Sequence, residues 1–218
     1  MFKRHLDVME DSLSVLKREA KAFGGDPDWP WSGLVLSFAT LGGSSNWDNR
    51  IKKRKEEFSW AAVSALDAEA RKALFHGLPN PRFRSRVEGY VELAFQRIKA
   101  AGGPSAARAE YDRLSSGDEH IAFFLAFDGI GKKYARNIPM DVHDPLVCDS
   151  YALDHRLKGI LAKLTGREMN YREGEEYLRA IARELGIDGW TFDRVLYGRY
   201  KEIMHDLEVI ENGALAPA

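Results

Sequence analysis

Apolar side chains recur every three or four residues along most of this chain, which is the period of a helix with one buried face. In the first segment they stand at Leu6, Met9, Leu13 and Leu16, and Gly24-Gly25-Asp26-Pro27 ends the pattern. Similar spacing predicts further helices over residues 33–40, 82–101, 106–114, 119–127, 150–164, 172–185 and 190–204, and one or two short helices over 59–75. No segment alternates apolar and polar residues as a half-buried strand does. We therefore predict an all-α fold of roughly ten helices joined by short turns.

Polar residues mark two of the predicted helix starts. Ser32 stands immediately before the apolar segment 33–40, and Asp67 stands immediately before Ala68. A serine or aspartate oxygen in this position accepts a backbone N–H of the first helical turn. We expect each residue to cap the helix that follows it.

The composition is that of a soluble globular protein. Hydrophobic residues make up 44% and charged residues 30% of the 218 positions, and no apolar run approaches the ~20 residues that span a bilayer. The first residues, MFKRHLDVMEDSL, are acidic where a signal peptide needs an apolar stretch. We expect a cytoplasmic protein without a membrane partner.

The chain has one cysteine, Cys148, and six histidines. A single cysteine excludes an internal disulfide, a four-cysteine zinc site and a four-cysteine iron–sulfur cluster. The histidines show no metal-ligand spacing, and His143-Asp144 beside Asp141 is weak evidence for a metal. We expect neither a metal nor a cofactor.

Charge alone does not indicate a nucleic-acid partner, because the net charge is −1 and the pI is near 6.6. A nucleic-acid site must therefore come from local clusters of basic residues. The run 52–55 is followed by two glutamates, which favours a solvated helix face. Arg82, Arg84 and Arg86 follow a turn at 76–81, where either a contact to a nucleic-acid backbone or a solvated helix start fits.

A glycine pair interrupts the helical pattern in Phe127-Asp128-Gly129-Ile130-Gly131-Lys132-Lys133-Tyr134-Ala135, with a predicted helix on each side. Two glycines permit a tight turn that side chains would obstruct. The helix from Lys132 then begins with backbone N–H groups and the positive end of its dipole, next to Lys132, Lys133 and Arg136. A helix start of this kind binds a phosphate. A simple turn between two helices is the alternative.

This segment resembles the hairpin of the helix–hairpin–helix DNA glycosylases, the superfamily of endonuclease III and the 8-oxoguanine glycosylases. Their hairpin reads Leu-Pro-Gly-Val-Gly-x-Lys-x-Ala, and Phe127 and Asp128 depart from it. In members that also cleave the strand, the lysine two places after the second glycine is the nucleophile, and Lys133 occupies that position. The resemblance implies that Gly129 and Gly131, with neighbouring basic residues, contact DNA phosphates.

A catalytic aspartate follows that lysine by about eighteen residues in the family, after an apolar run, as in Val-Asp-Thr-His. Asp149, in Leu146-Val147-Cys148-Asp149-Ser150-Tyr151, stands sixteen residues after Lys133. The shorter spacing and the tyrosine in place of histidine are departures. Asp149 could instead be only a helix cap. The competing aspartate is Asp154, which the helix predicted over 150–164 places in mid-helix as a surface residue.

Two upstream segments give weaker matches. Gly77-Leu78-Pro79-Asn80-Pro81-Arg82-Phe83-Arg84 parallels the family's Gly-Leu-Tyr-x-x-Lys-Ala, and Leu36-Ser37-Phe38-Ala39-Thr40 parallels Leu-Ser-x-Gln-Thr without the glutamine. Asn46 and Trp47 follow a turn where family members place wedge or pocket-edge residues. The resemblance spans roughly residues 34–164. The absence of four cysteines favours the 8-oxoguanine branch, which has no iron–sulfur cluster.

The resemblance implies a two-lobed fold with a cleft between the lobes. Residues 34–143 would form a helical barrel lobe ending in the hairpin, and residues 1–33 with 144–218 would form the second lobe. It implies a monomeric base-excision-repair enzyme that acts on double-stranded DNA, nucleoid-associated if the chain is bacterial, with Lys133 and Asp149 as catalytic residues. DNA contacts would come from Gly129, Gly131, Lys132, Arg136, Arg82 and Arg84. The expected reaction is removal of a damaged base, with 8-oxoguanine as the leading substrate, followed by lyase cleavage through a lysine Schiff base.

Three other functions remain open from the sequence. One is a monofunctional glycosylase, which releases the base and leaves the strand intact. Another is a non-catalytic helix–hairpin–helix module that binds DNA. The last is a helical interaction protein in which the hairpin match is a coincidence.

Overall fold

The computed structural model describes residues 1–41, 51–76 and 84–214, and this part of the chain is helical with no strand. The predicted all-α fold is confirmed. No helix in the described part is long and apolar enough to cross a membrane.

The chain divides into two compact units, one formed by residues 22–142 and the other by residues 1–21 together with 143–218. The boundaries fall in the last turn of helix α1 (Phe2–Gly24) and directly after helix α8 (Lys132–Asp141). The middle of the chain therefore forms one unit and its two ends form the other. The domain ranges 34–143 and 1–33 with 144–218 stay a prediction.

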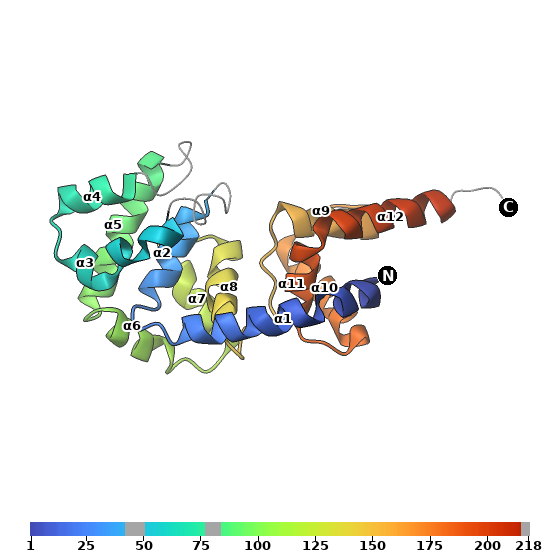
Figure 1. Cartoon of the computed structure of the whole chain (residues 1–218), viewed down its shortest axis with the longest axis horizontal. Helices are drawn as coiled ribbons and strands as arrows, with labels where there is room; N and C mark the ends of the chain where they lie inside the picture. Colours follow the sequence, from blue (N-terminus) through green and yellow to red (C-terminus); the bar gives the residue numbers. More distant parts are fainter. Residues whose placement is uncertain (42–50, 77–83, 215–218) are drawn as a thin grey trace. The chain divides into compact units, whose positions relative to one another are not determined.

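The unit of residues 22–142 contains most of the short helices (Figure 1). After the end of α1 they are α2 (Trp31–Ala39), the 3₁₀ helix η2 (Lys52–Phe58), α3 (Trp60–Ser64), α4 (Ala68–His76), α5 (Arg84–Ala100), α6 (Pro104–Tyr111), α7 (Gly117–Leu125) and α8. Helix α2 packs against both α5 and α8, and α7 packs against α8. This arrangement holds the segment between α7 and α8 against the rest of the unit.

Aromatic side chains form much of the core of this unit. Trp31 of α2 is fully buried, and its ring packs edge-on against Phe75 of α4 and Phe95 of α5. The Trp31 indole Nε1 donates a hydrogen bond to the Phe58 carbonyl at 2.8 Å. A buried indole N–H needs such a partner, so Trp31 fixes η2 against α2 as well as filling the core.

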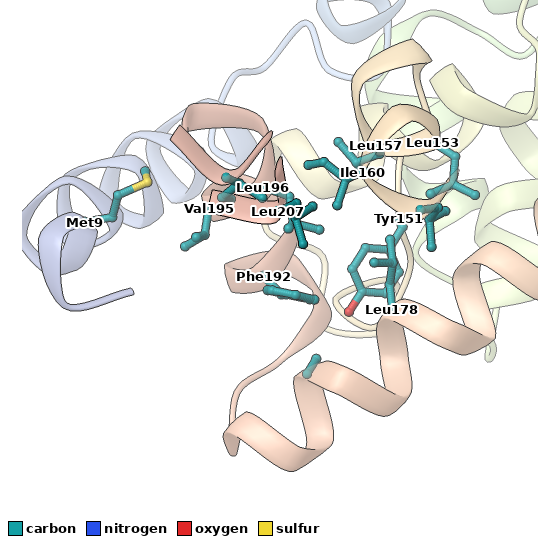
Figure 2. Packing of buried hydrophobic residues seen from close by; sticks show 13 residues of the cluster. Met9, Tyr151, Leu153, Leu157, Ile160, Leu178, Phe192, Val195, Leu196 and Leu207 are labelled. Carbon is teal, nitrogen blue, oxygen red and sulfur yellow. The ribbon is translucent and has the colours of Figure 1, made fainter. Parts of the chain in front are cut away.

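The other unit holds the first 21 residues, most of α1, and helices α9 (His155–Thr165), α10 (Tyr171–Leu185), α11 (Gly189–Gly198) and α12 (Tyr200–Ala214). Its core is mostly aliphatic, with Tyr151 and Phe192 among its members, and Figure 2 shows side chains of α9, α11 and α12 converging in it. Met9 of α1 belongs to the same cluster, and Phe2, Leu6 and Leu13 pack against it. The first helix of the chain is therefore a structural part of a core whose other members follow residue 150.

Beyond small shifts of helix ends, the structure differs from the sequence prediction at one helix cap and two helix boundaries. Helix α2 begins at Trp31 with Pro30 at its N-cap, so Ser32 lies inside the helix and is not a cap. The predicted helix 190–204 is two helices, α11 and α12, separated at Arg199. Asp67, in contrast, caps as predicted, because its Oδ1 accepts the Ala70 N–H at 2.8 Å.

The third difference concerns the predicted helix 150–164, which begins only at His155. Residues 151–153 are buried but not helical, and distant acceptors bind their backbone N–H groups. Tyr151 donates to Glu175 at 3.1 Å, Ala152 to Asp193 at 3.2 Å and Leu153 to the Tyr171 hydroxyl at 3.1 Å. Distant side chains therefore satisfy the backbone N–H groups of this apolar run, which is buried without being helical.

Candidate active site

The predicted hairpin forms a tight connection between α7 and α8. The Phe127 N–H donates to the Phe124 carbonyl at 3.0 Å, and the Ile130 N–H donates to the Phe127 carbonyl at 3.1 Å. Phe127 and Ile130 are buried, whereas Asp128, Gly129 and Gly131 are exposed. The apolar positions thus anchor the turn and leave its backbone at the surface.

Gly129 is required by two features of this turn. Its φ is +81°, a conformation that residues with a Cβ rarely adopt. A Cβ at this position would also lie 2.4 Å from the Cδ2 atom of Tyr90, which projects from α5 beneath the turn. The backbone of Gly129 therefore lies directly against the Tyr90 ring.

Gly131 has a different role. Its φ of −88° and ψ of 178° are ordinary extended values, and a Cβ built on it has no neighbour within 4 Å. It is the N-cap of α8 and contributes no side-chain cap. No capping side chain therefore covers the start of α8. Its first N–H groups can be reached by an anion, which is how a helix N-terminus binds a phosphate.

Helix α5 holds the hairpin at a second point. The Arg97 guanidinium donates to the Ala126 carbonyl at 2.6 Å and lies 4.7 Å from the centroid of the Phe127 ring. Tyr90 and Arg97 are seven residues apart and so share one face of α5. Neither residue could be identified from the sequence, because no local pattern links them to the hairpin.

Lys133 is the second residue of α8 and is half-buried. Its Nζ lies 4.4 Å from the centroid of the adjacent Tyr134 ring. Lys132 is exposed beside it, and the Arg136 guanidinium donates to the Lys132 carbonyl at 3.1 Å. Three basic residues therefore gather within the first two turns of α8.

Asp149 lies in an exposed turn, and the helix predicted directly after it begins only at His155. Its Oδ1 accepts the N–H of Gly189, the first residue of α11, at 3.2 Å, and its carbonyl accepts Arg179 Nε at 3.1 Å. The expectation that a helix follows Asp149 in the sequence is therefore wrong. A Cβ on Gly189 would lie 2.9 Å from the Asp149 Cα, so the two backbones are in close contact.

Asp154 occupies the helix start instead. It is the N-cap of α9, and its Oδ1 accepts the N–H groups of Arg156 at 2.9 Å and Leu157 at 3.1 Å. The expectation that Asp154 is a mid-helix surface residue is wrong, because residues 151–153 are not helical. Asp154 is half-buried, and it follows the apolar pair Ala152-Leu153.

Cys148 precedes Asp149 directly in the sequence. It forms a partly buried cluster with His143 and Trp190. The Cys148 Sγ lies 3.9 Å from His143 Nδ1, and the His143 and Trp190 rings are 4.8 Å apart. Burial raises the pKa of Cys148 from about 9 to about 11, so its thiol is protonated near neutral pH. Burial, and next the charge of Lys17, lower the pKa of His143. In the described residues no three His, Cys, Asp or Glu side chains are placed to hold a metal ion.

The unit of residues 22–142 contains five of the predicted site residues together, on the hairpin and the start of α8: Gly129, Gly131, Lys132, Lys133 and Arg136. Asp149 and Asp154 belong to the other unit. Arg82, Asn46 and Trp47 lie outside the described residues. Arg84 is the first residue of α5, and its side chain lies outside the described part.

No protein-family model and no curated protein matches this sequence. Among solved structures, the chain is similar to Methanocaldococcus jannaschii 8-oxoguanine glycosylase/lyase in complex with a 15mer DNA containing 8-oxoguanine. That match has a TM-score of 0.72 and 17% identity, and it covers 90% of this chain and 96% of the other. Methanocaldococcus jannaschii 8-oxoguanine DNA glycosylase gives a TM-score of 0.70 at 17% identity, covering 89% and 91%. The resemblance to the 8-oxoguanine branch is thereby confirmed at the level of the fold.

Proposed function

We propose that this protein is a DNA glycosylase that removes a damaged base and then cleaves the strand through a Schiff base on Lys133. One observation carries the proposal. In a chain with the fold of an 8-oxoguanine glycosylase/lyase, Lys133 stands in the first turn of α8, two residues beyond Gly131 of the hairpin. The leading substrate is duplex DNA that contains an oxidised purine such as 8-oxoguanine.

The chemistry needs an amine that is neutral when it attacks. The Lys133 nitrogen would form a bond to C1′ while the bond from C1′ to the base breaks, and the base would leave with that electron pair and take a proton from the nitrogen. Opening of the sugar at O4′, which takes a proton from solvent, would leave a protonated imine. Loss of a proton at C2′ would then expel the 3′ phosphate and nick the strand.

A carboxylate beside the sugar would stabilise the positive charge that develops as the base leaves. Asp149 is the residue that the sequence motif favours. Asp154 is the alternative, because it also follows apolar residues and it is the N-cap of α9, the helix that the sequence predicted directly after Asp149. Each carboxylate has one oxygen, Oδ1, that accepts backbone N–H groups.

Borohydride trapping tests the role of Lys133. Incubation with lesion duplex and borohydride should link the wild-type protein covalently to DNA, because borohydride reduces the imine to a stable amine. Lys133→Gln should neither become linked nor nick the strand. Lys201→Gln, which removes an exposed charge from α12, is the matched control and should behave as wild type.

The outcomes separate the alternatives. Wild-type trapping by Lys133→Gln would move the nucleophile to Lys132 or reject the mechanism. Release of the base without trapping or nicking would indicate a monofunctional glycosylase. Binding in a gel shift with no base release from a panel of lesions would indicate a non-catalytic DNA-binding module, and no binding at low salt would indicate an interaction protein.

A further inference from the structure

Tyr134 has a side chain that links the Lys133 amine to helix α2. Its ring lies under the Lys133 ammonium, with Nζ 4.4 Å from the ring centroid. Its hydroxyl oxygen lies 3.4 Å from Thr40 Oγ1, at the C-cap of α2. Neither contact follows from the hairpin motif, in which the position after the lysine is unrestricted.

The contact to Thr40 orients the ring. Thr40 Oγ1 lies 3.0 Å from the Leu36 carbonyl, 3.2 Å from the Ser37 carbonyl and 3.4 Å from the Tyr134 hydroxyl, so the tyrosine oxygen joins the hydrogen-bonding groups at the C-cap of α2. Since α2 packs against α8, this contact fixes the outer end of the ring to a neighbouring helix of the same unit.

The ring face in turn restrains Lys133. A lysine side chain has four rotatable bonds, and holding it in one arrangement costs conformational entropy. The electron-rich face of an aromatic ring attracts a cation that lies over it. A protonated imine on Lys133 carries its positive charge on the same nitrogen, so the ring face would stabilise this cation as it forms from the neutral amine.

We propose that Tyr134 is a positioning residue that holds the Lys133 nitrogen at the start of α8 and stabilises the cationic imine formed on it. This inference rests on the proposed function, because it assumes that Lys133 is the nucleophile. The effect on the rate of imine formation comes from the aromatic face of Tyr134, and the contact with Thr40 holds the ring in place. DNA affinity should not depend on it.

The test is the rate of borohydride trapping on a duplex with a single abasic site, which forms the imine without any lesion being known. Tyr134→Leu should trap about three- to thirty-fold more slowly than wild type, the range that corresponds to the loss of a cation–π contact. Tyr134→Phe keeps the ring and should stay within about three-fold of wild type, as should Thr40→Val, which removes only the anchor. Affinity for a duplex with a reduced abasic site should be the same in all four proteins.

A matched control is available in the other unit. The Arg156 guanidinium lies 4.5 Å from the centroid of the Tyr197 ring on α11, which is an equivalent cation–π pair. Tyr197→Leu should leave the trapping rate unchanged. Tyr134→Met, with an unbranched side chain that adapts to its surroundings, replaces Tyr134→Leu if thermal melting shows that the leucine variant does not fold.

Three results would overturn the inference: a wild-type trapping rate in folded Tyr134→Leu or Tyr134→Met, an equal loss in Tyr134→Phe, or a loss that appears entirely in DNA affinity. Failure of the proposed function looks different. In that case the wild-type protein does not trap, or Lys133→Gln traps as wild type does.

Discussion

The two candidate aspartates differ in the number of backbone N–H groups that their carboxylates accept. Asp154 holds two N–H groups at the start of α9, whereas Asp149 holds the single N–H of Gly189. An asparagine keeps an oxygen at the same place and removes the negative charge, so it separates the two functions. Substitution by asparagine therefore tests charge, and substitution by alanine tests the hydrogen bonds.

We expect Asp149→Asn to bind lesion duplex about as well as wild type and to lose a hundred-fold or more in the single-turnover rate of base release, because an oriented charge at the sugar is lost. The same measurement on Asp154→Asn decides between the two residues. The catalytic carboxylate is Asp154 if only that variant shows the loss. Asp154→Ala should also be less stable by about 1 kcal/mol in urea unfolding, as expected for a lost N-cap.

Cys148 should react slowly while the protein is folded. Its thiol pKa is raised to about 11, and the thiolate is the form that reacts with iodoacetamide. Alkylation of native protein at pH 8 should be much slower than alkylation in urea, and it should accelerate as the pH approaches 11. Equal rates in native and unfolded protein would mean that the site is open to solvent.

The same pKa gives a pH dependence of stability. Below about pH 9 the thiol is protonated in both the folded and the unfolded protein, so its contribution is fully present. As the pH rises from 9 toward 11, only the unfolded chain loses the proton, and the free energy of unfolding falls. Urea unfolding of Cys148→Ala should show a smaller fall than wild type over this range.

At the scale of elements, the hairpin depends on helix α5 as much as on its own sequence. Tyr90 fills the space under Gly129, and Arg97 binds the carbonyl at the end of α7. The hairpin, its lysine and the helices around it could be predicted from the sequence, because glycines and apolar spacing are local signals. Tyr90 and Arg97 could not, because their contacts join residues about thirty to forty positions apart.

The helix after Asp149 was predicted to begin too early, and the reason is a related physical one. The apolar residues 151–153 have a spacing that suits a helix, but their backbone N–H groups bind Glu175, Asp193 and Tyr171. Those acceptors come from α10 and α11, and the sequence around residues 151–153 does not indicate them. As a result the helix start moved five residues along the chain, from 150 to 155.

The two glycines of the hairpin should respond differently to substitution. Gly129→Ala should destabilise the protein by about 1–2 kcal/mol from its positive φ alone, with a further cost from displacing Tyr90. Gly131→Val should cost less, about 1 kcal/mol or below, because a Cβ there has no neighbour within 4 Å and the loss comes from the poorer N-cap. If the start of α8 binds a phosphate, Gly131→Val should nevertheless weaken binding to every duplex alike.

The two glycine variants control for each other. Gly131→Val tests the contact with DNA with little effect on folding, whereas Gly129→Ala affects both DNA binding and stability. Unchanged DNA affinity in Gly131→Val would mean that the hairpin does not touch DNA, and the proposed function would lose its main support.

At the scale of the molecule, a net charge of −1 leaves DNA binding to local groups. The hairpin, Lys132, Arg136 and some of Arg82, Arg84 and Arg86 should contact about 3–5 phosphates. Because each neutralised phosphate releases condensed counterions, log K should fall with log salt at a slope of roughly −3 to −5. Titration of a labelled duplex between low and physiological salt measures the slope, and a value near zero would exclude phosphate contacts.

The division of the chain also sets the order in which the protein is completed during translation. Residues 22–142 emerge from the ribosome as one block and have all the partners of their own core. Met9 and its neighbours on α1 emerge before that block, yet the cluster they belong to is completed only when Leu207 of α12 has been made. Closing a contact over nearly the whole chain is slow compared with local helix formation. The apolar face of α1 therefore stays uncovered by its own core until α12 has been made, and apolar surface exposed in this way is prone to aggregation.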